Sequence, residues 1–354
     1  MFMNALVLHA VGDARHESVR TPEPRRRQVR IRVGFCGVCG SDISRFFGEG
    51  PHTLPLVCGH EFAGTVEQTG PEVDDFHIGD RVAVFPLLWC GSCGPCEKGL
   101  FAQCLGYDYI GSRSDGAFAE YVIVPTRNLI RIPTHVSLEE AALVEPAAVA
   151  LHSLRRAGGC SIGDCVAIFG AGPIGLMVAQ WARAMGASVV VIFDLVAEKL
   201  AIARQLGFSY VFDIGEHDPI QTIEDLTGGL GAHVCVDAAG VPQATVQSLQ
   251  GARRHGRVVF LGNPADDLLV PKNVISQLMR REVHILGTWN SDYSVAGGQD
   301  DWHDALAGLA SGVINVTPLI SLKVKLRDAF EALKIMRDRK ESCCKMLIYP
   351  EPGP

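Results

Sequence analysis

The spacing of hydrophobic and polar residues changes character near residue 150. Before that point, short segments alternate apolar and polar residues with a period of two, which predicts β-strands that bury one face. Turn residues such as Gly79 and Asp80 separate these segments. The first part of the chain is therefore expected to be β-rich, with strands at residues 1–9, 29–33, 61–66, 81–85 and 118–124.

The second part of the chain alternates apolar strands with helices. Ser137-Leu-Glu-Glu140 is a capping box that opens a short helix, and Pro146 fits the first position of a second helix that runs to Arg155. From residue 165 the regular alternation predicts a parallel sheet covered on both faces. The predicted strands are 166–169, 189–193, 210–212, 234–236, 258–261 and 284–287, with helices from near residues 174, 197, 220, 243 and 274. Helices at 301–310 and 327–339 and a strand at 345–349 complete the chain.

Composition narrows the classes of protein that fit this pattern. The chain has 354 residues, 47% of them hydrophobic and 20% charged, so it can form two domains with large cores. A net charge of -7 argues against nucleic acid or an anionic membrane surface as a partner. The N-terminal residues lack the basic lead of a signal peptide, and no uncharged apolar run approaches the ~18 residues that cross a bilayer. We therefore expect a cytoplasmic protein whose cysteines are reduced thiols or metal ligands.

Four cysteines with the spacing C-x2-C-x2-C-x7-C indicate a zinc site. Four thiolates can close a tetrahedral shell around one zinc ion, and the glycines and proline between them suit a loop that wraps a metal. Two disulfides are the competing interpretation, but nothing indicates an oxidising compartment. A closed four-thiolate shell has no open position, so this zinc is expected to be structural. The expected ligands are Cys90, Cys93, Cys96 and Cys104.

A glycine-rich turn predicts a dinucleotide site. The sequence G-x-G-x-x-G at residues 170–175 follows an apolar strand and opens a helix, which is the context of a nucleotide-binding βαβ unit. The first glycine makes the tight turn, the second lets the backbone approach the pyrophosphate, and the third lets the helix pack on the strand. The pyrophosphate then lies at the helix N-terminus, where free N–H groups attract anions. The expected binding residues are Gly170, Gly172, Pro173, Ile174 and Gly175.

Asp194 favours NAD over NADP. It stands at the end of the next predicted strand, 19 residues after Gly175, where a carboxylate accepts hydrogen bonds from the adenosine ribose and repels a 2′-phosphate. No arginine follows it directly. Lys199 is a further candidate for ribose contact, although a solvated helix face explains it equally well.

A second set of metal-ligand residues lies in the first part of the chain. Cys39, His60 and a carboxylate from Glu61 or Glu145 suit a catalytic zinc with an open fourth position. Glu145 precedes Pro146 and is expected to be an N-cap outside the helix, free to aim its carboxylate at the metal. One thiolate and one carboxylate already neutralise Zn²⁺, so both acids are not expected to bind tightly at once. A buried thiol, a local ion pair and a helix cap are the plain alternatives for these residues.

Together these motifs resemble the zinc-dependent medium-chain alcohol and polyol dehydrogenases. The residues that carry the resemblance are Cys39-Gly-Ser41-Asp42, Gly59-His60-Glu61, the four-cysteine segment, Glu145-Pro146 and the glycine turn. The resemblance implies an α/β protein with a GroES-like β-rich catalytic domain and a doubly wound Rossmann domain. The implied limits are 1–153 with 290–354, including a structural zinc lobe near 89–105, for the first domain, and 154–289 for the second. It also implies two zinc ions per chain, NAD, and a homodimer or homotetramer.

The acidic third ligand resembles the sorbitol and threonine dehydrogenase branch. Segments 110–121 and 289–302 further resemble the bacterial galactitol-1-phosphate 5-dehydrogenases, which act on a phosphorylated polyol. By resemblance, Cys39, His60, Glu61 and Glu145 surround the catalytic zinc and Ser41 takes the substrate proton toward solvent. The family's relay histidine is replaced by Ser44, so the route beyond Ser41 is open, with His52 and His152 as candidates.

Several functions stay open at this stage. The expected reaction is oxidation of a secondary hydroxyl of a polyol or polyol phosphate to a ketone. A free-polyol dehydrogenase or L-threonine 3-dehydrogenase is the nearest alternative. A non-catalytic NAD-binding zinc protein is an alternative of another class, and Cys36 near Cys39 and the Cys343-Cys344 pair keep it open. Arg45 and Arg113 are the candidate anchors for a substrate phosphate.

Overall fold

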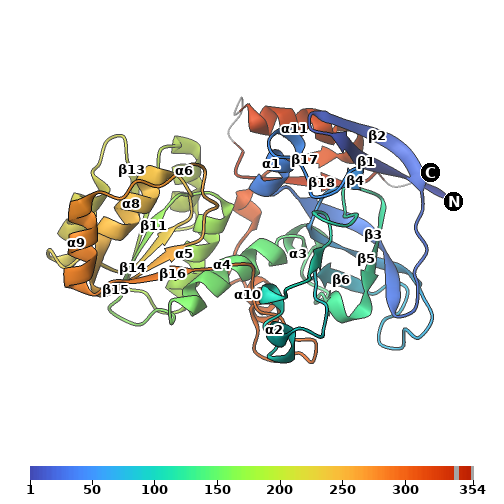
Figure 1. Cartoon of the computed structure of the whole chain (residues 1–354), viewed down its shortest axis with the longest axis horizontal. Helices are drawn as coiled ribbons and strands as arrows, with labels where there is room; N and C mark the ends of the chain where they lie inside the picture. The colour runs from blue at the N-terminus through green and yellow to red at the C-terminus, as the bar shows by residue number, and fades with distance from the viewer. Residues whose placement is uncertain (339–342, 352–354) are drawn as a thin grey trace. The chain divides into compact units, whose positions relative to one another are not determined.

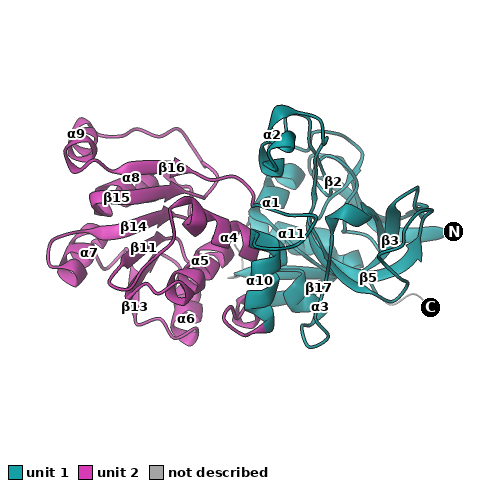
Figure 2. Cartoon of the chain, turned by 90° about the horizontal axis from the view of Figure 1, so that it is seen from below, with its two compact units in different colours: residues 1–145, 292–310, 320–354 teal, residues 146–291, 311–319 magenta. Residues whose placement is uncertain are grey.

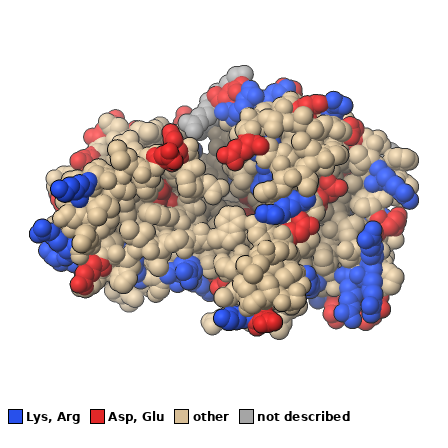
Figure 3. All heavy atoms as spheres, viewed as in Figure 1, with Lys and Arg blue, Asp and Glu red and all other residues tan. Residues whose placement is uncertain are grey.

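The computed structural model describes residues 1–338 and 343–351. The chain forms two compact units, residues 1–145, 292–310 and 320–354, and residues 146–291 and 311–319 (Figure 2). The assignment of residues 1–153 and 290–354 to a catalytic domain, and of residues 154–289 to a dinucleotide-binding domain, remains a prediction. No helix in the described ranges has the length and apolar character that crossing a bilayer requires. Acidic and basic side chains are interspersed on the face drawn in Figure 3.

The first unit is built around a seven-stranded sheet whose central strand is β3. This strand pairs antiparallel with β5, β9 and β18, so the end of β3 lies beside the start of β5 and within the reach of β18. From one edge of the sheet to the other, neighbouring strands are β10 (Leu129–Arg131), β6 (Arg81–Val84), β5 (Glu61–Thr69), β3 (Gln28–Gly37), β18 (Lys345–Tyr349) and β17 (Ile320–Lys325). Strand β9 (Tyr121–Pro125) also pairs with β3.

Smaller sheets and short helices complete the first unit. A three-stranded sheet has the order β2 (Asp13–Arg20), β1 (Phe2–Ala10) and β4 (Leu56–Val57), and a two-stranded one joins β7 (Leu87–Leu88) to β8 (Asp108–Tyr109). Their apolar faces and those of the main sheet share one buried core. The helices are α1 (Gly40–Phe47), α2 (Gly94–Glu97), α3 (Leu138–Ala141), α10 (Asp301–Ala310) and α11 (Ala329–Arg337), with 3-10 turns η1 (Phe101–Gln103), η2 (Thr126–Asn128) and η4 (Leu326–Asp328).

The second unit is a doubly wound sheet of six parallel strands (Figure 1). Its order is β13 (Tyr210–Asp213), β12 (Val189–Asp194), β11 (Cys165–Phe169), β14 (Ala232–Asp237), β15 (Ala252–Phe260) and β16 (His284–Gly287). Numbered within the sheet, this order is 3-2-1-4-5-6, that of a Rossmann domain. The connecting helices are α4 (Val144–Arg156), α5 (Pro173–Ala184), α6 (Ala197–Gln205), α7 (Pro219–Thr227), α8 (Pro242–Gly251) and α9 (Lys272–Arg281), with η3 (Thr317–Leu319) later in the chain.

The expected alternation of strands and helices in this unit is confirmed, and so is the α/β fold with a β-rich first unit. The capping box is also present: the Ser137 hydroxyl accepts from the backbone N–H of Glu140, whose carboxylate accepts from the backbone of Ser137. The sequence pattern did not predict β2, β17 or helix α1, nor the short elements β4, β7, β8, β10 and α2. The helix expected at 327–339 begins at Ala329, after a 3-10 turn, and Arg339 lies outside the described residues.

The position of Glu145 corrects one expectation. Glu145 lies inside the first turn of α4 rather than at its N-cap, because α4 begins at Val144 and Pro146 is its third residue. A proline within the first turn interrupts no intrahelical hydrogen bond, so the helix can start earlier than the proline rule suggested. The Glu145 carboxylate is therefore aimed by a rigid helix and not by a flexible capping residue.

Candidate active site and metal centres

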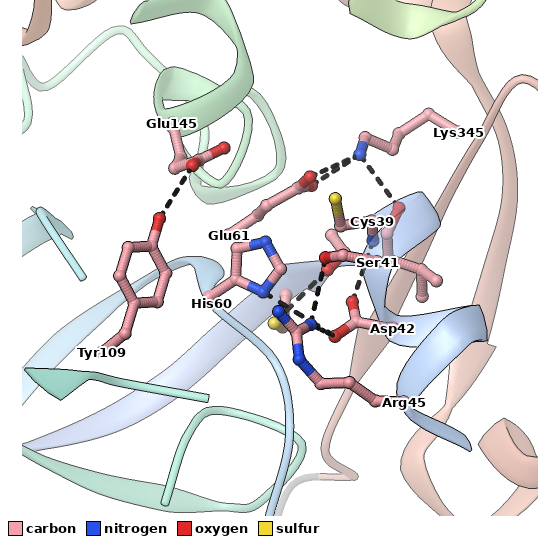
Figure 4. A network of polar contacts seen from close by, with 12 residues as sticks. Cys39, Ser41, Asp42, Arg45, His60, Glu61, Tyr109, Glu145 and Lys345 are labelled. Carbon is pink, nitrogen blue, oxygen red and sulfur yellow. Dashed lines mark hydrogen bonds and ion pairs between the residues drawn. The ribbon is translucent and has the colours of Figure 1, made fainter. Parts of the chain in front are cut away.

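Three candidate ligands meet where β3 ends and β5 begins. Cys39 is the N-cap of α1, directly after β3, and His60 and Glu61 open β5. Gly59 before them has φ +97°, and a Cβ there would clash with the ring of Phe118, so this turn requires glycine. The ligand atoms of Cys39, His60 and Glu61 all lie within 4.8 Å of one another (Figure 4).

Asp42 and Arg45 from α1 support the imidazole of His60. Asp42 is fully buried and places Oδ1 3.7 Å from Nδ1 of His60, while the opposite edge of the ring faces Cys39 and Glu61 (Figure 4). Nδ1 of His60 is itself buried without a hydrogen-bond partner among the described residues. Nη1 of Arg45 donates to Asp42 Oδ1 and to Ser41 Oγ, both at 3.0 Å. A carboxylate behind a histidine fixes the ring orientation of a metal-binding imidazole.

Lys345 was not expected at this site. Its ammonium donates to both carboxylate oxygens of Glu61, at 2.8 and 2.6 Å, and to the backbone oxygen of Val38 at 2.9 Å. Lys345 and Glu61 are buried, with exposures of 3% and 1%. Burial alone would lower the pKa of Lys345. The negative charge of Glu61 outweighs that effect, so the pKa of Lys345 is raised. The signal in the sequence was a lysine at the start of an otherwise apolar strand. A lysine that is buried in such a strand needs an acidic partner.

Glu145 approaches the same three residues from α4 but is held by a tyrosine. The hydroxyl of Tyr109 donates to Oε1 of Glu145 at 3.2 Å, and the Tyr109 ring lies edge-on to His60 with centroids 5.8 Å apart. Burial and the nearby charges of Glu61 and Cys39 outweigh the opposite effect of His60 and raise the pKa of Glu145 to about 8. Glu145 does not belong to the group of ligand atoms within 4.8 Å of one another.

The residues fit a zinc ion. Ligands at about 2.0–2.3 Å from a tetrahedral zinc are about 3.3–3.8 Å apart, so the cluster of Cys39, His60 and Glu61 needs only a small contraction. Burial, Glu61 and Asp42 raise the pKa of the Cys39 thiol. A divalent cation reverses that shift, since a coordinating thiol is deprotonated. The set supplies one thiolate, one imidazole and one carboxylate, and leaves a fourth position.

The four-cysteine segment also has the geometry of a metal site. Cys90, Cys93, Cys96 and Cys104 are free thiols, so the disulfide alternative does not describe this structure. Their sulfur atoms lie 4.0 Å (90 to 96), 3.4 Å (93 to 96) and 3.9 Å (93 to 104) apart, near the spacing of about 3.8 Å expected around zinc. A backbone hydrogen bond at Ser92 lowers the pKa of Cys90 to about 6. The donor set fits a closed, four-thiolate ion.

The glycine turn has the expected geometry. Gly170 has φ +112°, and a Cβ on Gly175 would lie 1.9 Å from the Gly170 oxygen, so neither position accepts a side chain. Gly172 caps α5 and has open space where a Cβ would point. Pro173 and Ile174 form the first turn of α5. Gly170 and Ala171 donate their N–H groups within the protein, so the first turn of α5 is the part of this motif that can bind a phosphate.

The side chain of Asp194 is tied to this turn. It lies at the end of β12, accepts from the backbone of Ala171 at 2.7 Å through one oxygen, and accepts from Leu195 and Val196 through the other. Lys199 follows in the first turn of α6. The structure thus brings Asp194 to the glycine turn. The contacts of Asp194 and Lys199 with a ribose remain predictions.

The fold and the sites define a two-domain, zinc-binding dehydrogenase that uses a nicotinamide cofactor. Residues 25–134 match the family model of the alcohol dehydrogenase GroES-like domain, and residues 173–311 match that of the zinc-binding dehydrogenase. The chain belongs to the zinc-dependent medium-chain alcohol and polyol dehydrogenases, which are oxidoreductases.

Individual relatives cover nearly the whole chain. It is 36% identical over 334 residues to galactitol 1-phosphate 5-dehydrogenase of Escherichia coli K12, covering 94% of this chain and 96% of that enzyme. The crystal structure of galactitol-1-phosphate dehydrogenase from Escherichia coli is 34% identical in sequence and superimposes with a TM-score of 0.92 over 98% of this chain and all of that one. Sorbitol dehydrogenase of Bacillus subtilis is 31% identical, covering 98% and 97%. A zinc-binding dehydrogenase from Sinorhizobium meliloti 1021, solved with NADP bound, is 31% identical with a TM-score of 0.90 and coverage of 99% and 100%.

Proposed function

We propose that this protein oxidises a secondary hydroxyl of a phosphorylated polyol to a ketone with NAD⁺, using one catalytic and one structural zinc ion per chain. The best candidate reaction is galactitol 1-phosphate to tagatose 6-phosphate. The observation that carries the proposal is the cluster of Cys39, His60 and Glu61, whose donor atoms suit a catalytic zinc with an open position. Cys90, Cys93, Cys96 and Cys104 form the structural site in this proposal.

The chain's own groups orient the reactants and move the proton. Cys39, His60 and Glu61 hold the metal, and Asp42 keeps the imidazole of His60 in place. A zinc ion bound there acts as a Lewis acid that lowers the pKa of a substrate hydroxyl. Ser41 would accept the substrate proton on Oγ while passing its own hydroxyl proton on toward solvent, and the hydrogen bond from Arg45 holds that oxygen in place. The glycine turn and Asp194 would hold the dinucleotide, whose nicotinamide would supply the hydride acceptor.

NAD is proposed over NADP because of Asp194. Its carboxylate lies at the glycine turn, where it disfavours a 2′-phosphate, and the residues that follow it, Leu195, Val196 and Ala197, are uncharged. The relative from Sinorhizobium meliloti was solved with NADP, so membership of the family does not by itself decide between NAD and NADP. We propose residues 154–289 as the dinucleotide-binding domain.

Charge pairing near the metal site favours Arg113 as the anchor of a substrate phosphate. Arg45 is neutralised by Asp42 at 3.0 Å, and Lys345 is neutralised by Glu61. Arg113 contacts only uncharged groups in the described part of the chain: its guanidinium stacks on the Tyr107 ring at 4.5 Å and reaches the Tyr107 hydroxyl at 3.4 Å. Its backbone N–H donates to Tyr109, which ties it to the site. A cation without an acidic partner can bind a phosphate without first breaking an existing ion pair.

Arg113→Met should therefore weaken binding of a phosphorylated substrate. A hydrogen bond to a charged group contributes about 1.5–3 kcal/mol, so KM for galactitol 1-phosphate should rise about 10- to 100-fold. KM for free galactitol should not change. Arg131→Met is the matched control, since Arg131 stacks on Phe76 and pairs with Asp80 elsewhere in the same unit. Equal effects of Arg113→Met on both substrates would contradict the anchor.

A substrate panel tests the proposed function itself. NAD⁺ and NADP⁺ reduction should be measured with galactitol 1-phosphate, galactitol, sorbitol and L-threonine. The proposal expects the highest kcat/KM for galactitol 1-phosphate with NAD⁺. A preference for sorbitol or threonine would identify the alternative substrate within the family. Zinc-loaded protein without turnover on any of the four would overturn the proposal.

A further inference from the structure

Tyr109 belongs to a turn that is packed against the segment carrying His60. Its backbone oxygen accepts from the N–H groups of three later residues, Ser112, Arg113 and Ser114, so the turn is tightly closed. A Cβ on Gly111 or on Gly116 would lie 2.2 or 2.3 Å from the backbone oxygen of Gly59, directly before His60. The turn and the His60 segment therefore touch through backbone atoms, which fixes the Tyr109 ring relative to the imidazole.

Glu61 and Glu145 are both candidate carboxylate ligands for the same metal position. Glu61 is within 4.8 Å of the other ligand atoms, whereas Glu145 lies outside that group although its charge reaches Cys39, His60 and Glu61. A second inner carboxylate fills the position that a substrate hydroxyl needs and reduces the Lewis acidity of the ion. An open fourth position therefore requires that Glu145 stay out of the inner shell of the metal.

The Tyr109 hydroxyl is the group that holds Glu145. It donates to Oε1 at 3.2 Å, and Figure 4 shows this oxygen of Glu145 facing the tyrosine, while the other carboxylate oxygen points away from it. For Glu145 to bind the metal through that oxygen, it would have to give up its hydrogen bond from Tyr109 in a buried site. Leaving a buried polar group without its partner costs about 1–3 kcal/mol.

We propose that Tyr109 is a positioning residue that keeps Glu145 out of the inner shell of the catalytic metal, so that Cys39, His60 and Glu61 are the inner ligands and the fourth position stays available. This inference rests on the proposed catalytic metal site, in which Cys39, His60 and Glu61 are the ligands.

The experiment measures access to the fourth position without measuring turnover. Wild type and Tyr109→Phe are loaded with Co²⁺, and the spectrum of identically loaded Cys39→Ser protein is subtracted to remove the four-cysteine site. Imidazole, which needs a free position on the metal, is titrated against the remaining cobalt bands. We expect imidazole to bind about tenfold more weakly to Tyr109→Phe, the size of one lost buried hydrogen bond. KM for the polyol should rise more than kcat falls.

A second variant separates positioning from packing. Adding Glu145→Gln to Tyr109→Phe removes the competing ligand and should restore imidazole binding. Tyr121→Phe is the matched control, since Tyr121 lies on β9 with its ring under Arg30. Unchanged imidazole binding in Tyr109→Phe, or weakened binding that Glu145→Gln does not restore, overturns the inference. Wild-type protein without Cys39-dependent cobalt bands would instead defeat the proposed metal site itself.

Discussion

Replacing Cys39 with serine should reduce turnover at least about 1,000-fold while leaving the protein folded and its four-cysteine zinc in place. Lowering the pKa of a hydroxyl from ~16 to ~7 corresponds to about 12 kcal/mol, and a loss of only a third of that is about 1,000-fold in rate. Serine is neutral at neutral pH and binds zinc poorly, so the remaining set of His60 and Glu61 should not retain the ion. Metal analysis should find one zinc per chain in the variant and two in the wild type.

Cys36→Ser is the matched control for this variant. Cys36 lies three residues earlier on β3, is buried, and directs its thiol toward the Gly37 oxygen at 3.6 Å rather than toward the ligand cluster. It should keep both zinc ions and most of its activity. Full activity of Cys39→Ser, or equal loss in the two variants, would show that the Cys39 cluster is not the catalytic centre.

Local sequence patterns were sufficient for the parts of the site that depend on neighbouring residues. The spacing of Cys90, Cys93, Cys96 and Cys104 brings four thiols together within one short segment, and the positive φ of Gly170 follows from a tight turn between strand and helix. Gly-His-Glu at residues 59–61 was also recognisable, because its two candidate ligands are adjacent in the sequence and lie together at the start of a strand. What these residues bind remains a prediction that the cobalt and zinc measurements test.

The partners of these residues were not predictable from spacing. Lys345 reaches Glu61 across 284 residues because β18 pairs with β3, which in turn pairs with β5. Tyr109 reaches Glu145 because a turn packs on Gly59 through two glycines. Neither contact follows from periodicity, since both depend on which strands become neighbours in the folded sheet. The misplaced N-cap at Glu145 has a different cause, since proline is tolerated anywhere in the first helical turn.

Lys345→Met should destabilise the metal-free protein by about 3–5 kcal/mol, the usual cost of leaving one partner of a buried ion pair unpaired. Methionine fills a similar volume, so the effect isolates the charge rather than a cavity. Glu61 then remains buried with a negative charge and no cation. For a unit of this size, about 2–4 °C in Tm accompanies each kcal/mol, so the unfolding temperature should fall by about 6–20 °C.

Three comparisons identify the cause of that loss. Adding Glu61→Gln should recover most of the stability, because removing both charges is nearly neutral. Lys323→Met should cost at most about 1 kcal/mol, since the Lys323–Glu139 pair at 3.0 Å lies at the surface. Zinc should restore part of the loss in Lys345→Met, because a cation bound by Glu61 replaces the missing ammonium, and it should restore none in the double variant. Calorimetry with and without a chelator measures all of these, and a Lys345→Met protein as stable as the Lys323→Met control would show that the buried pair does not hold Glu61 in place.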